Sequence, residues 1–186
     1  MVCFLRFECM KILDHALAVA PRALFLAALV ALAPLAPLAN ANPREDTLQA
    51  EASLRGGDVP TAMALLRKAS DQGHPAAQAR LADLLHAAEF DKEAVALYRK
   101  AAEQGDPAGE FGLGRMYANG TGVARDTALA LGWYRKAEKQ NHAPALDARA
   151  RAHRAGDLGL VRNLEQAEVF ETRARSARQA LLKDSK

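Results

Sequence analysis

One short pattern occurs three times along the chain and limits its possible fold more than any other feature. It consists of Ala, then Arg-Lys-Ala five residues later, then Gln three residues after the second Ala, and it begins at Ala62, Ala94 and Ala130. The three copies start 32 and 36 residues apart, and a weaker fourth copy begins at Ala167. Repeats with this period are typical of solenoids, in which neighbouring helical units share one continuous core.

The residues between the copies predict where helices end and begin. Gly73, Gly105 and Asn141 directly follow the shared Gln, and both residue types tolerate the left-handed conformation that ends a helix. Pro75 and Pro107 come two residues after these glycines, where proline suits the first turn of a new helix. Each copy is therefore predicted to be a helical hairpin, with small Ala side chains where the helices approach closely.

These signals predict an all-α protein, a right-handed α-solenoid of antiparallel helix hairpins with a C-terminal capping helix. Only 5% of the residues are aromatic, which does not favour a β-sandwich. The last helix is expected near 164–182, and its apolar stripe is expected to form one buried face, made of Ala167, Phe170, Ala174, Ala177 and Leu181. The alternative is that this helix pairs with another subunit.

The first 41 residues are predicted to be a signal peptide. An apolar run over 23–33 is followed by Pro34 and Pro37, and Ala39-Asn40-Ala41 matches the small-x-small pattern of a cleavage site. The uninterrupted run is shorter than the roughly 20 residues of a spanning helix. We therefore expect a protein secreted across the inner membrane into a bacterial periplasm, without stable membrane insertion after cleavage; an uncleaved inner-membrane anchor is the alternative.

The segment LGRMYANGTGVARD (113–126), followed by ALGWYRKAEKQ (130–140), resembles the Sel-one-like repeat (SLR), a relative of the tetratricopeptide repeat (TPR). The resemblance implies a repeat domain over 46–182, with units near 46–73, 74–105 and 106–141, and a degenerate unit over 142–174. Residues 42–45 and the tail 183–186 are expected to be loose.

The resemblance also implies a binding site on the concave face, which the first helix of each repeat lines. The residues at the TPR groove positions are Asp83, His86, Arg115, Asn119, Arg151 and Arg154. This set contains more basic than acidic residues, and arginine can bind a carboxylate with two hydrogen bonds. An acidic peptide is therefore the expected ligand. The alternative is that these six are ordinary solvent-facing residues.

No catalytic or metal-binding motif occurs after residue 41. Both cysteines, Cys3 and Cys9, lie in the leader, no His-x-x-His spacing is present, and His74 and His142 are expected to be solvated turn residues. The 22 basic and 20 acidic residues of this part nearly balance, which gives no reason to expect nucleic acid as a partner.

The sequence thus favours an exported adaptor, scaffold or regulator that binds a protein or peptide, with no enzyme activity and no cofactor. The alternatives are an exported hydrolase or enzyme inhibitor built on the same repeats, or a structural piece of a larger envelope assembly. The oligomeric state is left open.

Overall fold

The computed structural model describes residues 42–184 of the 186-residue chain, and the predicted signal peptide lies outside the described residues. The described part belongs to one compact unit and is made of α-helices without any strand. The helices are α2 (Pro43–Arg55), α3 (Val59–Asp71), α4 (Pro75–Ala87), α5 (Asp91–Glu103), α6 (Pro107–Asn119), α7 (Thr127–Lys139), α8 (Ala143–Ala155) and α9 (Leu164–Asp184).

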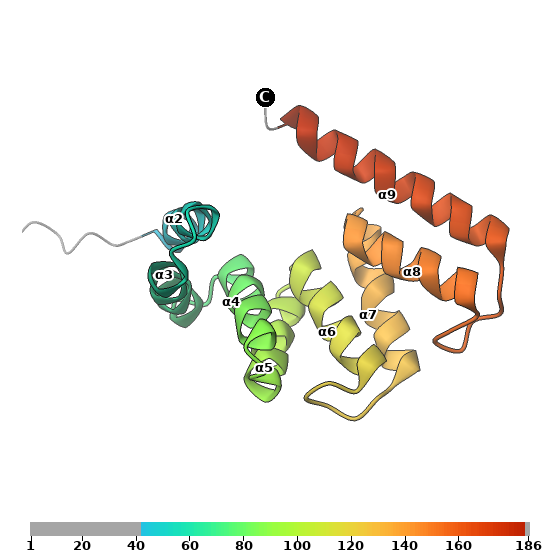
Figure 1. Ribbon diagram of the computed structural model, residues 1–186, viewed down its shortest axis with the longest axis horizontal. Coiled ribbons are helices and arrows are strands. Elements are labelled where there is room, and N and C mark those ends of the chain that lie inside the picture. The colour runs from blue at the N-terminus through green and yellow to red at the C-terminus, as the bar shows by residue number, and fades with distance from the viewer. Residues whose placement is uncertain (1–41, 185–186) are drawn as a thin grey trace, which may run out of the picture. The chain divides into compact units, whose positions relative to one another are not determined.

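The helices form successive hairpins that stack in chain order (Figure 1). α2 packs against α3, α4 against α5, α6 against α7, and α8 against α9. The second helix of each hairpin contacts the first helix of the next, and α4 also contacts both α2 and α6. This arrangement confirms the predicted solenoid of helical hairpins with a C-terminal helix.

Capping side chains determine where several helices begin. The carboxylate of Asp106 accepts a hydrogen bond from the Gly109 amide (2.7 Å), and that of Asp126 accepts one from the Leu129 amide (2.9 Å). Asp58 caps α3 in the same way. Each cap satisfies a backbone N–H that has no partner inside its helix.

The predicted helix stops are also observed. Gly73, Gly105 and Asn141 have φ angles of 82°, 80° and 56°, in the left-handed region. At the front of the domain, however, residues 42–45 are not loose as expected. Helix α2 already begins at Pro43, because the Asn42 side chain accepts a hydrogen bond from the Arg44 amide (3.1 Å) and Pro43 suits a first turn.

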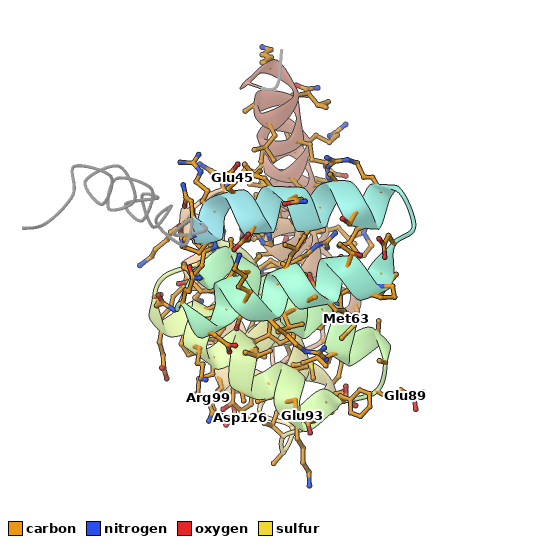
Figure 2. The ribbon with its side chains drawn as sticks, turned by 90° about the vertical axis from the view of Figure 1, so that its left-hand side faces the viewer. Glu45, Met63, Glu89, Glu93, Arg99 and Asp126 are labelled. Carbon is orange, nitrogen blue, oxygen red and sulfur yellow. The ribbon has the colours of Figure 1, made fainter. Side chains whose placement is uncertain are left out.

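The repeated alanines form the seam between helices. Ala62, Ala94 and Ala130 are fully buried, and so are the second alanines of the pattern, Ala69 and Ala101. The Arg-Lys pair between them is exposed in all three copies; Arg99, for example, lies at the lower edge of the stack in Figure 2. Small side chains at these positions let the helix backbones approach closely.

Helix α9 differs from the prediction at its C-terminal end. Ala167, Phe170 and Ala174 are buried, and Ala177 is half-buried, as the stripe predicts. Leu181 is 67% exposed, so the prediction of a fully buried face is wrong there. The physical reason is length: α8 has 13 residues and α9 has 21, so α9 extends past the start of α8 (Figure 1).

Candidate functional site

A buried tyrosine connects polar side chains of α4 and α6, the first helices of two neighbouring hairpins. Tyr98 comes from the second helix α5, is almost fully buried, and donates a hydrogen bond from its hydroxyl to Asp83 of α4 (2.6 Å). The same hydroxyl accepts a hydrogen bond from Arg115 of α6 (3.0 Å). Burial, together with the charge of Asp83, raises the pKa of Tyr98, so the hydroxyl stays protonated and keeps donating.

A glycine makes room for this tyrosine. A Cβ atom on Gly112 of α6 would lie 2.2 Å from Cε1 of Tyr98. Gly114 has the same relation to Tyr134 of α7, whose ring atoms would lie 2.8 Å from an added Cβ. The two glycines therefore let α6 approach both neighbouring second helices and bring Arg115 to the surface between them.

A cleft of about 370 Å³ lies between α6 and α8. Its apolar lining includes Phe111 and Tyr134, whose rings stack with centroids 5.7 Å apart. The guanidinium of Arg115 lies 5.9 Å from the centre of the Phe111 ring. Asn119, Arg151 and Asp157 also contribute to the polar lining. The cleft thus combines aromatic surface with two guanidinium groups.

The two arginines of the cleft differ in whether other side chains of the protein bind them. Arg115 is held by Tyr98 and lies 3.8 Å from a carboxylate oxygen of Asp83. Arg151 is exposed and has no ion pair among residues 42–184. The one carboxylate that lines the cleft, Asp157, lies 3.5 Å from Arg125, so its charge is already partly balanced. Positive charge therefore exceeds negative charge at the mouth of the cleft.

The structure brings together three of the six predicted groove residues, Arg115, Asn119 and Arg151. Asp83 lies in a neighbouring hollow of about 430 Å³ beside Arg80. The remaining two predicted residues have partners away from both hollows. His86 Nδ1 lies 2.6 Å from an oxygen of Asp91, and Arg154 is 2.5 Å from Glu171.

Sequence reasoning missed Phe111 and misjudged His142. The His142 ring is half-buried, 5.4 Å from the Phe111 ring, and burial lowers its pKa, so it is neutral near pH 7. It is therefore not the solvated turn residue that was expected. His74 is also engaged, because its Nδ1 accepts a hydrogen bond from the Ala77 amide (3.3 Å). The sequence position of both histidines could have indicated this, because each occupies the N-cap of the first helix of a hairpin, as Asp106 does.

The described residues hold no cluster of three or more His, Cys, Asp or Glu side chains that suits a metal ion. None of the helices between residues 42 and 184 is both long and apolar enough to cross a membrane.

The model of the Sel1 repeat matches this chain over residues 54–74, 91–106 and 107–142. The chain belongs to the Sel1-like repeat family. Sel1-like repeat proteins generally mediate protein–protein interactions and are typically scaffolds, not enzymes. The matched segments end at residue 142, so α8 and α9 of this Sel1-like repeat protein lie outside them.

Several solved structures share the fold. A Sel1 repeat protein from Oxalobacter formigenes is 22% identical over 72% of this chain and 56% of its own, with a TM-score of 0.65. A putative Sel1 repeat protein from Klebsiella pneumoniae subsp. pneumoniae is 24% identical over 73% of this chain and 68% of its own, also with a TM-score of 0.65.

A third similar structure is c5321, described as a protective antigen of uropathogenic Escherichia coli with an SLR fold. It is 27% identical over 73% of this chain and 30% of its own, with a TM-score of 0.61. This Sel1-like repeat protein therefore spans about half the length of the first of these relatives and a third of c5321. No curated protein matches the chain.

Proposed function

We propose that this Sel1-like repeat protein is an exported adaptor or scaffold that binds an acidic segment of a partner protein in the cleft between α6 and α8. The single observation that carries the proposal is Arg151, which is exposed beside Arg115 and the aromatic lining and has no ion pair within the described helices. An unpaired guanidinium in a cleft suits a carboxylate ligand, because it can donate two parallel hydrogen bonds.

The surroundings of Arg151 favour a peptide over a free ion. The rings of Phe111 and Tyr134 offer apolar surface for the side chains that flank a carboxylate, and Asn119 adds a donor and an acceptor for a peptide backbone. Arg115 is better suited to hold the cleft together than to move toward a ligand, since Tyr98 and Asp83 already engage it. Export is part of the proposal on the strength of the leader-like sequence before residue 42.

We expect Arg151→Glu to weaken binding of an acidic peptide at least tenfold. Hydrogen bonds to charged groups contribute about 1.5–3 kcal/mol, and 1.4 kcal/mol corresponds to a factor of ten. The probe is a fluorescein-labelled peptide that alternates Glu with Gly and Ser, and fluorescence anisotropy measures its dissociation constant. Arg162→Glu is the matched control, because Arg162 is exposed and lies outside the cleft.

Equal affinity of the Arg151→Glu and Arg162→Glu proteins for this peptide would contradict the proposal. Arg115→Glu is a poor test, because the new carboxylate would face Asp83 and would break the hydrogen bond to Tyr98. A loss of binding in that variant would not separate ligand contact from damage to the cleft.

A further inference from the structure

A second groove lies beside the C-terminal half of α9, separate from the Arg151 cleft. It has a volume of about 750 Å³, the largest of the described hollows. One wall is the start of α6 and the turn into α8, with Pro107, His142 and Pro144, and the other wall is α9, with Ala177, Ala180 and Leu181. A hollow of this size takes several side chains at once.

The α9 wall is an apolar helix face that lacks a covering helix. Ala174, Ala177 and Leu181 are spaced three and four residues apart, so they lie on one side of α9. The start of α8 covers Ala174 completely and Ala177 partly, whereas Leu181 is exposed. Helices α2–α8 all have 13 residues, so α9 is eight residues longer than its neighbour α8, which leaves Leu181 uncovered near the end of α9.

The charge at the rim of the groove is unbalanced. Glu138 of α7 accepts hydrogen bonds from two arginines, Arg149 of α8 (2.8 Å) and Arg173 of α9 (2.7 Å). Two guanidinium groups thus share one carboxylate, and Arg173, which lines the groove, is 40% exposed. A carboxylate from another molecule would balance this charge.

A second copy of the chain is a poor occupant of the groove. The C-terminal half of α9 carries the exposed basic residues Arg175 and Lys183, in addition to Arg178, which forms an ion pair with Asp147 of α8. If two copies paired through this end of α9, these basic residues would face one another and repel. The charge pattern therefore favours a partner with acidic side chains.

We propose that the α9 groove binds an amphipathic helix of a partner protein, which inserts apolar side chains between α9 and the start of α8 and pairs an acidic side chain with Arg173. The partner helix occupies the place along α9 where α8 is absent. This is the helix-in-groove mode of recognition, in which apolar residues at positions i, i+3, i+4 and i+7 supply the anchors. The inference does not depend on the Arg151 cleft.

The test uses the full chain and three labelled peptides of roughly 14 residues, close to the length at which an isolated helix begins to be stable. The first carries Leu at helical spacing with Glu on the flanks, the second replaces every Glu by Lys, and the third replaces every Leu by Ser. Fluorescence anisotropy gives the three dissociation constants. We expect the acidic amphipathic peptide to bind at least tenfold more tightly than the other two.

Two variants of α9 locate the binding site. Ala180→Glu places a carboxylate in the groove and is expected to weaken binding of the acidic amphipathic peptide at least tenfold. Leu181→Ser removes apolar contact without adding charge and is expected to weaken it severalfold. Gln179→Glu is the matched control, because Gln179 is exposed on the same turn, does not line the groove, and adds the same charge. All three positions are exposed, so none of these changes disturbs the core.

The outcomes separate this inference from the proposed function. Unchanged affinity in both Ala180→Glu and Leu181→Ser overturns the inference, as does equal binding of the acidic and basic peptides. If Arg151→Glu abolishes binding and Ala180→Glu does not, the peptide binds in the cleft, so the proposed function stands and the inference fails. A full chain that sediments as a dimer, and becomes a monomer on Ala180→Glu, would assign the groove to a second copy instead.

Discussion

Glycines inside helices have opposite roles in this protein, depending on what surrounds them. Gly112 of α6 lies against the ring of Tyr98, whereas Gly132 of α7 has no atom within 4 Å of the place where a Cβ would stand. Glycine in a helix costs about 0.5–1 kcal/mol relative to alanine, because it is more flexible in the unfolded chain. Of these two glycines, only Gly112 compensates for this cost, by allowing Tyr98 to reach Asp83 and Arg115.

We expect Gly112→Ala to lower the free energy of unfolding by about 1–3 kcal/mol, the usual cost of overpacking a core. We expect Gly132→Ala to raise it by about 0.5–1 kcal/mol. Urea denaturation followed by circular dichroism measures both changes. An unchanged or higher free energy of unfolding in Gly112→Ala would show that Tyr98 does not depend on the space at residue 112.

The buried carboxyl of Glu110 makes stability depend on pH. Burial raises its pKa above the usual value, although the side chain of Gln140 donates a hydrogen bond to it (3.0 Å). A group whose pKa is raised by folding favours the folded state below its unfolded pKa of about 4.5, and this contribution is lost as the pH rises through the folded pKa.

We therefore expect Glu110→Gln to unfold at a higher urea concentration than the wild type at pH 7. Glutamine still accepts a hydrogen bond but has no charge to bury. The advantage should shrink as the pH falls toward 4, where Glu110 becomes protonated. A difference between the two proteins that stays constant from pH 4 to pH 7 would argue against an ionised, buried Glu110.

At the scale of elements, α9 combines two functions in one helix. Its first half completes the core: Phe170 is buried, its ring stacks on His153 with centroids 5.5 Å apart, and Arg149 lies 4.7 Å from its ring centre. Its last turns extend beyond α8, and Leu181 is exposed there. Apolar residues recur at the same spacing in both halves. The two halves differ in burial because α8 is too short to cover the whole of α9.

We expect Phe170→Ala to reduce the free energy of unfolding by about 3–5 kcal/mol, as is typical of a buried aromatic residue. We expect Leu181→Ala to change it by less than about 0.5 kcal/mol, as is typical of an exposed position. Thermal or urea denaturation of the two variants provides the comparison. A large loss of stability on Leu181→Ala would mean that the end of α9 packs against the domain.

At the scale of the whole molecule, the core is continuous from one hairpin to the next. Leu85 of α4 and Leu97 of α5 contact both the cluster around Leu66 and the cluster around Met116. Repeat units that share a core in this way are stabilised chiefly by their neighbours, so unfolding is expected to involve the whole stack.

A single fluorescent residue allows this cooperativity to be measured. Trp133 is the one tryptophan of the chain and lies on α7, whereas Leu66 is buried on α3 in an earlier hairpin. We expect Leu66→Ala to destabilise the protein by about 2–5 kcal/mol and to shift the Trp133 fluorescence transition as far as the circular dichroism transition. A Trp133 transition that stays at the wild-type midpoint would show that the hairpins unfold independently.

Much of the fold was predictable because its signals are local. The Arg-Lys-Ala repeat, the residues after each shared Gln and the proline positions predicted the hairpins, and helix caps such as Asp106 act within three residues of the chain. The candidate site was predictable only in part. Repeat position predicted Arg115, Asn119 and Arg151, which line one cleft, but it also selected His86 and Arg154, whose partners come from neighbouring segments.

The sequence by itself determined the helical hairpins, their order and the family, because these depend on periodicity and on interactions within one or two helical turns. The tertiary structure decided which charged residues are free and which are held. Arg115 is held by Tyr98, 17 residues away, and Arg173 by Glu138, 35 residues away, whereas Arg151 has no such partner within residues 42–184. Contacts over these separations depend on how the helices pack, and so does the groove beside α9.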